Sequence, residues 1–376
     1  MDASTLPLSD LCGQLVVGGF VGMDLPESFA RELRARRRAG AIVFRRNVAD
    51  LVQVAELCAA IRNAAQRELA PFVAVDQEGG RVSRLPEPFL VLPPMRTLGR
   101  IDELGLTRRA ARVVGLELGA LGFNLDFAPV LDVDSNPANP VIGDRSFGAE
   151  PERVARHGLA FIEGLSSSGL CACAKHFPGH GDTSQDSHFE LPTVAHGDER
   201  LRHIELAPFV AAIGARVDAM MSAHVVVRAW DAHQPATLSR RICTELLRGE
   251  LGFEGVLFSD DLEMKAIARD PGVELAAPAA IEAGCDVLLV CRDEELQCRV
   301  HEALVRRAEQ DGAFEARCRQ AARRSMDLRQ RRGGPMPEAS PSSPQDRRAR
   351  LQARIERALG SEQARQIAAR LSRATS

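Results

Sequence analysis

Short runs of apolar and β-branched residues recur along the chain and alternate with longer segments of helical periodicity. The longer segments carry apolar residues at three- and four-residue steps, which is typical of amphipathic helices that cover a core. The predicted strands are Gln14–Phe20, Ala41–Phe44, Phe72–Asp76, Asn124–Val130, Cys171–Phe177, Ala219–His224, Val256–Asp260 and Asp286–Cys291. The predicted helices include Leu51–Leu69, Leu106–Leu121, Pro151–Leu165, Arg200–Ile213 and Glu294–Arg307.

The order of these elements predicts an α/β fold. The strand runs are continuously apolar, as in Val287-Leu288-Leu289-Val290, so both faces of each strand are expected to be buried in a parallel sheet. Eight strand-helix units in about 300 residues is the number that a (β/α)8 TIM barrel needs. A doubly wound open sheet is the alternative, and it is disfavoured because no GxGxxG motif follows the first strand.

The composition changes after Arg332. Residues 333–344 contain two glycines, four prolines and three serines, and such a segment cannot bury enough apolar surface to order itself. Residues 346–376 hold eight arginines against three acids, with apolar residues at four-residue steps. We therefore predict a barrel domain over 1–332, a linker over 333–345 and a basic amphipathic helical tail over 346–376, broken near Gly360. Docking on its own domain or on a second subunit is the expected role of the tail, with nucleic acid or an acidic partner as the alternative.

Composition and charge narrow the class of protein. Of the 376 residues, 45% are hydrophobic and 26% are charged, which excludes a collagen-like or wholly disordered chain. The net charge of -3 gives no reason to expect nucleic acid or a membrane as a partner. The nine cysteines are scattered without paired spacing and are interpreted as reduced core thiols. Because neither a spanning apolar run nor a signal peptide is present, we expect a cytoplasmic location.

Lysine is almost absent from the chain. The chain contains two lysines, Lys175 and Lys265, and 46 arginines. The ammonium of lysine is compact and lies on a flexible side chain, whereas the guanidinium of arginine is planar, so the two groups form different contacts. In a chain that otherwise uses arginine, a position with lysine is therefore a candidate site. Lys265 lies on a predicted helix and is interpreted as a surface charge, whereas Lys175 adjoins an unusual cluster of histidines.

Polar residues gather where the predicted strands end, which is where the active sites of TIM barrels lie. The loop over 175–188 contains three histidines and two aspartates after the fifth strand. The other strand ends carry Asp76-Gln77-Glu78-Gly79-Gly80-Arg81, Gly143-Asp144-Arg145, His224 and Ser259-Asp260-Asp261.

Two kinds of chemistry use such a set of residues. A metal ion that activates water is the first, but the histidines lack the helical HExxH spacing, so no metal or other cofactor is expected. The second is double displacement on a sugar, in which one carboxylate attacks and another group protonates the departing oxygen. An extended Asp186-Ser187-His188 would place the carboxylate and the imidazole on one face, where the carboxylate can keep the imidazole protonated.

Four separated blocks resemble glycoside hydrolase family 3, in its β-N-acetylglucosaminidase branch. They agree with that family in order and spacing, and the resemblance covers roughly residues 10 to 310. The blocks are Lys175-His176-Phe177-Pro178-Gly179-His180-Gly181-Asp182-Thr183 with Asp186-Ser187-His188, Asp76-Gln77-Glu78-Gly79-Gly80-Arg81, Val141-Ile142-Gly143-Asp144-Arg145-Ser146-Phe147, and Phe258-Ser259-Asp260-Asp261-Leu262-Glu263-Met264. The resemblance implies a TIM barrel independently of the strand count.

The resemblance also implies roles for single residues. Asp260, rather than its neighbour Asp261, matches the nucleophile, and Asp186 with His188 matches an Asp-His dyad that serves as acid and base. Sugar-binding positions are matched by Asp76, Arg84, Arg145, Lys175 and His176.

Other assignments stay open at this point. Asp260 could instead cap the next helix, and the nucleophile would then be Asp261 or Glu78. The alternative to His188 as the acid is His180.

The function expected from these features is that of a retaining exo-β-N-acetylglucosaminidase. The resemblance implies a muropeptide substrate, GlcNAc linked to anhydro-N-acetylmuramic acid, and a place in peptidoglycan recycling. The alternatives are a noncatalytic sugar-binding or regulatory protein on the same barrel, a β-GlcNAc phosphorylase that uses phosphate in place of water, and a metal-dependent hydrolase.

Overall fold

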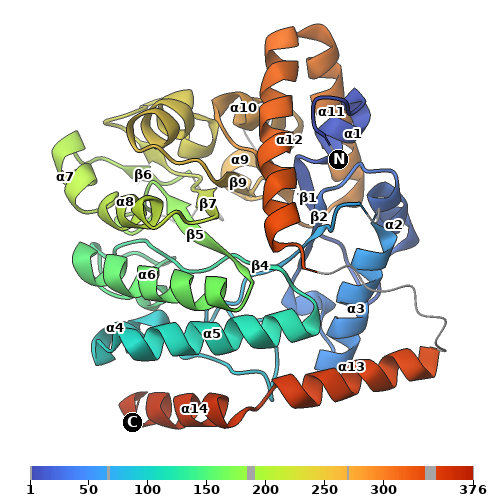
Figure 1. Cartoon of the computed structure of the whole chain (residues 1–376). Coiled ribbons are helices and arrows are strands. Elements are labelled where there is room, and N and C mark those ends of the chain that lie inside the picture. The colour runs from blue at the N-terminus through green and yellow to red at the C-terminus, as the bar shows by residue number, and fades with distance from the viewer. Residues whose placement is uncertain (1, 66–67, 184–190, 269–270, 335–343, 376) are drawn as a thin grey trace.

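The computed structural model describes residues 2–65, 68–183, 191–268, 271–334 and 344–375. Figure 1 shows a ring of helices around a central barrel, with two further helices of the C-terminal segment along one side. The strands are β1 (Val16–Gly18), β2 (Gly40–Val43), β3 (Phe72–Val75), β4 (Leu125–Asp126), β5 (Cys171–Phe177), β6 (Thr193–Val194), β7 (Ala219–Ser222), β8 (Val226–Val227), β9 (Val256–Asp261) and β10 (Val287–Val290).

The helices follow the strands in the order that a TIM barrel requires. The α-helices are α1 (Leu8–Gly13), α2 (Glu27–Arg34), α3 (Leu51–Ala64), α4 (Met95–Ile101), α5 (Leu104–Leu121), α6 (Pro151–Ser167), α7 (Asp198–His203), α8 (Ala207–Gly214), α9 (Lys265–Ala268), α10 (Val273–Ala283), α11 (Glu294–Gln310), α12 (Gly312–Arg332), α13 (Pro344–Ala358) and α14 (Glu362–Thr375). The remaining helices are the 3-10 turns η1 (Arg45–Asn47), η2 (Gly143–Arg145) and η3 (Ala236–Leu238), and the π-helix η4 (Arg241–Glu250).

The predicted TIM barrel is confirmed. Within the described ranges, eight parallel strands close in the order β1-β10-β9-β7-β5-β4-β3-β2, and β6 pairs with β8 apart from them. Each predicted strand run overlaps one barrel strand. The fourth strand is much shorter than predicted, since the run over 124–130 contains Pro129, which has no N–H to donate to a neighbouring strand.

One predicted helix is two helices in the structure. The segment Arg200–Ile213 is divided into α7 and α8, which end and begin on either side of residues 204–206. Pro208 lies in the first turn of α8, where its missing N–H costs nothing, and it would interrupt the interior of one continuous helix.

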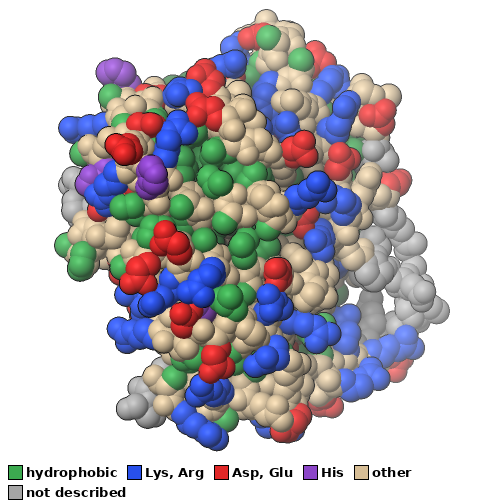
Figure 2. Space-filling model, turned by 60° about the vertical axis from the view of Figure 1, so that its left-hand side comes forward, with side chains coloured by type: hydrophobic (Ala, Val, Ile, Leu, Met, Phe, Trp, Pro, Cys, Tyr) green, Lys and Arg blue, Asp and Glu red, His purple; other side chains and the backbone are tan. Residues whose placement is uncertain are grey.

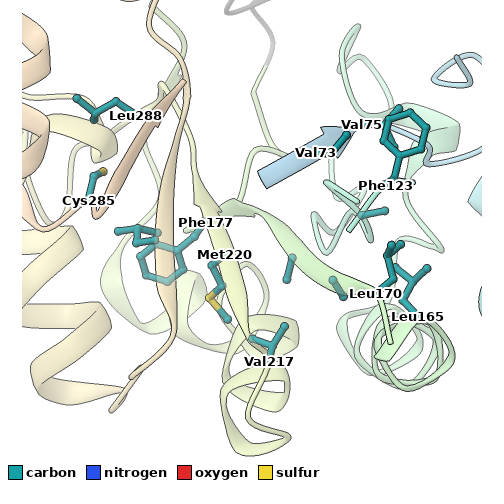
Figure 3. Packing of buried hydrophobic residues seen from close by; sticks show 14 of the residues in the cluster. Val73, Val75, Phe123, Leu165, Leu170, Phe177, Val217, Met220, Cys285 and Leu288 are labelled. Atoms are coloured by element: carbon teal, nitrogen blue, oxygen red, sulfur yellow. The ribbon is translucent and has the colours of Figure 1, made fainter. Parts of the chain in front are cut away.

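Alternate side chains of the strands form two separate apolar layers. Phe72, Phe127 and Phe258 point into the barrel, and their rings meet edge to face at centroid distances of 5.5 Å (Phe72 with Phe258) and 5.3 Å (Phe127 with Phe258). Val73 and Val75 belong to the outer layer between strands and helices, part of which is shown in Figure 3. Burial on both faces explains why the strands are continuously apolar in sequence.

The two ends of the barrel differ in how they are closed. Leu328 of α12 packs into the interior layer, so α12 closes the end at which the strands begin. The carboxyl ends of the strands carry the loops and the polar residues.

The C-terminal segment lies against the barrel helices. α13 packs beside α3 and α5, and α14 packs beside α4 and α5 (Figure 1). Apolar residues of both helices are buried there, and Gly360, between the helices, has a φ of 60°. Arg348 pairs with Glu56 at 2.8 Å and Arg370 with Glu103 at 2.5 Å. The predicted linker falls largely on residues 335–343, outside the described ranges, so the proposed domain boundaries stay a prediction.

Figure 2 shows hydrophobic side chains gathered across the middle of one face of the molecule. Basic and acidic side chains are interspersed over the lower half of that face, where the C-terminal helices lie. None of the helices in the described part of the chain is both long enough and apolar enough to cross a membrane.

Candidate active site

A cavity of about 290 Å³ opens among the carboxyl ends of the barrel strands. Six of the predicted site residues line it from five different segments, which are the ends of β3, β5 and β9, the loop after β3, and η2. They are Asp76, Arg84, Arg145, Lys175, His176 and Asp260. The other two, Asp186 and His188, lie outside the described residues.

The floor of the cavity is a buried network of charges. Lys175 Nζ lies 2.7 Å from Asp76 Oδ1 and 2.6 Å from Glu78 Oε1. Arg145 holds the other side of Glu78 with two parallel bonds of 2.8 Å, from Nε to Oε2 and from Nη2 to Oε1. Two of the three ammonium donors of Lys175 therefore bridge two carboxylates, and the compact ammonium does so in less space than a planar guanidinium needs.

These contacts set the charge states of the network. Burial opposes ionisation of Glu78, but Arg145 and Lys175 outweigh it and hold the pKa of Glu78 far below its usual range. Burial also opposes the charge of Lys175, but Asp76 and Glu78 raise the pKa of Lys175 above its ordinary value. Glu78, Lys175 and Arg145 therefore remain charged at neutral pH, although the side chains of Glu78 and Lys175 are only 2% and 3% exposed.

His176 is fixed by a residue that the sequence analysis did not single out. Its Nδ1 lies 2.6 Å from Asp132 Oδ2, so the imidazole donates through Nδ1, and its Nε2 lies 3.4 Å from Arg145 Nη2. The backbone N–H of His180 also donates to Asp132, at 2.6 Å. Asp132 is fully buried in an apolar run after β4, and an isolated acid in such a run is the signal that would have found it.

His180 lines the cavity but also holds the loop after β5. Its Nδ1 lies 2.8 Å from Thr183 Oγ1, and burial lowers the pKa of His180 to about 4. A neutral imidazole at physiological pH is a poor proton donor, so the acid role is less suited to His180.

Arg84 is positioned through its backbone. The backbone N–H of Arg84 donates to Gln77 Oε1 at 2.8 Å, and the backbone N–H of Gln77 donates to Asp126 Oδ1 at 2.9 Å. Asp126 is fully buried, and burial raises its pKa well above the ordinary value. The guanidinium of Arg84 then lies 3.8 Å from Asp76 Oδ2 and 5.9 Å from the centre of the Phe44 ring, which also lines the cavity.

Asp260 and its neighbour Asp261 differ in charge. Burial opposes ionisation of Asp260, but the electrostatic influence of His224, His176 and Lys175 and the hydrogen bond from the backbone N–H of Asp261 outweigh it, so the pKa of Asp260 is lowered. Burial, reinforced by the charge of Glu263, raises the pKa of Asp261 to about 7. Near pH 6, Asp260 is a carboxylate and Asp261 is mostly a neutral acid.

The hydrogen bonds give the two aspartates different tasks. Asp261 Oδ1 accepts from the backbone N–H of Glu263 at 3.1 Å and of Cys291 at 3.2 Å, so it shapes the turn that follows β9. Asp260 Oδ1 accepts only the adjacent N–H of Asp261, at 2.8 Å, among the described hydrogen bonds. Asp260 is therefore not the cap of the following helix.

Among the described side chains, no group of three or more histidine, cysteine, aspartate and glutamate residues is arranged to hold a metal ion.

The chain matches a known family over most of its length. The family model described as the glycosyl hydrolase family 3 N terminal domain matches residues 10–328. A relative from Pseudomonas aeruginosa (strain LESB58), named beta-hexosaminidase, is 44% identical over 262 residues, which cover 69% of this chain and 77% of the relative.

Solved structures of the same family resemble the chain closely. A glycoside hydrolase family 3 beta-N-acetylglucosaminidase from Paenibacillus sp. str. FPU-7 is 42% identical with a TM-score of 0.85, covering 94% of this chain and 69% of that one. NagZ from Neisseria gonorrhoeae, solved in complex with N-trifluoroacetyl-D-glucosamine, is 35% identical with a TM-score of 0.68, covering 83% of this chain and 98% of that one.

Glu78→Gln is expected to destabilise the protein strongly. The substitution leaves the buried Arg145 without its carboxylate, and breaking a buried ion pair from one side costs about 3–5 kcal/mol. Glu27→Gln is the matched control, because Glu27 pairs with Arg34 at a side chain that is 75% exposed and is expected to contribute less than about 1 kcal/mol. The measurement is the free energy of unfolding in urea, and equal losses in both variants would contradict the role given to Glu78.

The strand-end blocks, the closed barrel and the sugar-sized cavity agree with the family match and with the named relatives. The chain belongs to glycoside hydrolase family 3 and is a glycoside hydrolase of the β-N-acetylhexosaminidase type.

Proposed function

We propose that the protein is a retaining exo-β-N-acetylglucosaminidase that removes terminal β-linked GlcNAc by double displacement, with Asp260 as nucleophile. The observation that carries the proposal is the ionised Asp260 carboxylate in a cavity that also presents Lys175 and Arg145. A cavity of about 290 Å³ lies at the lower end of ligand pockets and suits one terminal sugar residue rather than a long chain.

The sugar-binding residues have distinct tasks in this proposal. Asp76, Lys175 and Arg84 meet at one side of the cavity and present charged donors and acceptors to the sugar hydroxyls. His176 is held by Asp132 and Arg145 by Glu78, so both also present their remaining polar atoms at the cavity. Because each charged group is already held by a partner, the site needs little reorganisation when the sugar binds.

The proposed reaction is a double displacement. Asp260 attacks the anomeric carbon as the bond to the glycosidic oxygen breaks, and His188 gives its proton to that oxygen. Water then attacks the same carbon, His188 takes a proton from it, and the carboxylate of Asp260 is released. Two inversions at one carbon restore the original configuration. Asp186 is the proposed partner that fixes the tautomer of His188.

The nucleophile is tested by substituting each aspartate of the pair. Asp260→Asn is expected to lower kcat for 4-nitrophenyl β-GlcNAc on the order of 10⁴-fold, because the amide cannot form the glycosyl intermediate. Asp261→Asn is the control, since it keeps an acceptor oxygen for the turn and resembles the protonated acid already present near pH 6. It is expected to keep the rate within about tenfold.

Mass spectrometry gives an independent reading of the same assignment. A fluorinated GlcNAc inhibitor that traps the glycosyl intermediate is expected to label the peptide that contains Asp260. A normal rate for Asp260→Asn, or a label on Glu78, would remove Asp260 from this role.

The acid role of His188 is tested by the leaving group. His188→Ala is expected to slow hydrolysis of phenyl β-GlcNAc by about 10²–10⁴-fold and to spare the 2,4-dinitrophenyl glycoside, whose leaving group departs without a proton. His203→Ala is the control, because His203 is exposed on α7. Equal losses for both substrates would argue against a proton donor at position 188.

The natural substrate is proposed to be a muropeptide in which GlcNAc is joined to anhydro-N-acetylmuramic acid, which places the enzyme in peptidoglycan recycling in the cytoplasm. The support is the resemblance of the four sequence blocks to the β-N-acetylglucosaminidase branch of the family. A higher kcat/KM for this disaccharide than for chitobiose is the expected result, measured by release of GlcNAc. Preference for chitobiose would point to chitin fragments instead.

A further inference from the structure

A fully buried histidine lies just beyond the end of β7, next to the strand that carries the proposed nucleophile. His224 follows Ser222, the last residue of β7, by two positions. β7 pairs with β9 in parallel, and the register places Met221 level with Phe258, so position 224 comes level with position 261. His224 is not one of the described residues that line the sugar cavity. It therefore lies beside the end of β9 without facing the sugar.

The imidazole of His224 binds the backbone that directly follows the proposed nucleophile. Its Nε2 lies 3.0 Å from the carbonyl oxygen of Asp261. A carbonyl oxygen only accepts, so Nε2 carries the proton of this hydrogen bond. The same carbonyl accepts from the backbone N–H of Met264, also at 3.0 Å, so both of its lone pairs are used. The side chain of His224 thus holds the turn after β9 from the side of β7.

The orientation of the imidazole is fixed from its other side. The Nδ1 of His224 lies 2.9 Å from the Oγ1 of Thr237, a fully buried residue of η3. This hydroxyl in turn lies 2.9 Å from Ser222 Oγ and 3.0 Å from the carbonyl of Ala223. Because both ring nitrogens have hydrogen-bond partners, the ring cannot turn without leaving a buried polar group unpaired.

The carboxylate of Asp260 depends on this backbone for its own position. Among the described hydrogen bonds, Asp260 Oδ1 accepts only from the backbone N–H of Asp261, at 2.8 Å. That N–H belongs to the residue whose carbonyl His224 holds. On the opposite side, the backbone N–H of Cys291 donates to Asp261 Oδ1 at 3.2 Å. Asp261 is therefore held from the sides of both neighbouring strands, by His224 next to β7 and by Cys291 next to β10.

We propose that His224 is a positioning residue for the reaction: its Nε2–H holds the carbonyl of Asp261 and thereby keeps the carboxylate of Asp260 within reach of the anomeric carbon. This role rests on the proposed function of Asp260 as nucleophile. Reacting atoms must lie about 3–3.5 Å apart, and a misplacement of about 1 Å can cost on the order of 10²-fold in rate. The electrostatic influence of His224 acts in the same direction, because it helps to lower the pKa of Asp260.

Three substitutions of His224 separate the contributions of its two ring nitrogens. The amide nitrogen of glutamine can take the place of Nε2 and that of asparagine the place of Nδ1, whereas leucine offers neither. His224→Gln is therefore expected to keep kcat/KM for 2,4-dinitrophenyl β-GlcNAc within about tenfold of the wild type, and His224→Asn and His224→Leu are expected to lose about 10²-fold. The leaving group of this substrate departs without a proton, so its rate reports the attack by Asp260.

The affinity for the sugar distinguishes positioning of the nucleophile from distortion of the whole cavity. The Kd of GlcNAc, measured by isothermal titration calorimetry, is expected to stay within about twofold of the wild type in all three variants, because only an interaction needed in the transition state is lost. His301→Asn is the matched control. His301 on α11 also donates through Nε2 to a backbone carbonyl, that of Ser9 at 2.8 Å, and its loss is expected to change neither kcat/KM nor Kd.

Equal rates in His224→Gln and His224→Asn would refute the positioning role, and so would a Kd of GlcNAc that rises in step with the loss of kcat/KM. If His224→Leu does not fold, the comparison of the two amide variants decides alone. Asp260→Asn, assayed beside them, keeps this result separate from the proposed function. An inactive Asp260→Asn together with fully active His224 variants would remove only the role of His224, whereas a normal rate in Asp260→Asn would remove both roles.

Discussion

A network of opposite charges is buried at the carboxyl end of the barrel, where burial disfavours the ionised form of each group. Glu78 is held by Lys175 on one side and by Arg145 on the other, and Lys175 in turn holds Asp76. Each contact offsets the cost of burying its neighbour, so the network keeps its charges only as a whole. The residues come from β3, η2 and β5, and the barrel is what brings them together. The network therefore links the closure of the sheet to the shape and charge of the cavity at its carboxyl end.

Asp260 and Asp261, which are adjacent at the end of β9, differ in ionisation because their surroundings differ in charge. Asp260 lies near His224 and His176 and keeps its charge, whereas Asp261 faces the acid Glu263 and backbone donors and is neutral over much of the acidic range. Side chains of successive strand residues point to opposite faces, so the two neighbours meet different surroundings. Both residues are aspartates, so the difference in their ionisation comes from their environment and not from the residue type.

The two ends of the barrel treat buried charge in opposite ways. At the open end, carboxylates balance the cations within hydrogen-bonding distance. At the end where the strands begin, the buried Arg329 donates to neutral acceptors, which are Gln14 Oε1 and the carbonyls of Ala39 and Ser325. The open end can offer its charged groups to a molecule from solvent, whereas a closed end offers a buried charge only the partners that the fold encloses.

The sequence by itself determined the eight strand runs and the fold, because burial on both faces of a parallel strand leaves a continuous apolar pattern within a few residues. It also pointed to Lys175 and to the polar strand ends, although the roles assigned to all eight site residues stay predictions. It did not reveal Asp132 behind His176, the division of Arg200–Ile213 into α7 and α8, or the uncompensated charge of Arg329. Those features depend on which distant segments come into contact, on the partners that each buried group meets and on the charges left over, and only the tertiary structure decides these.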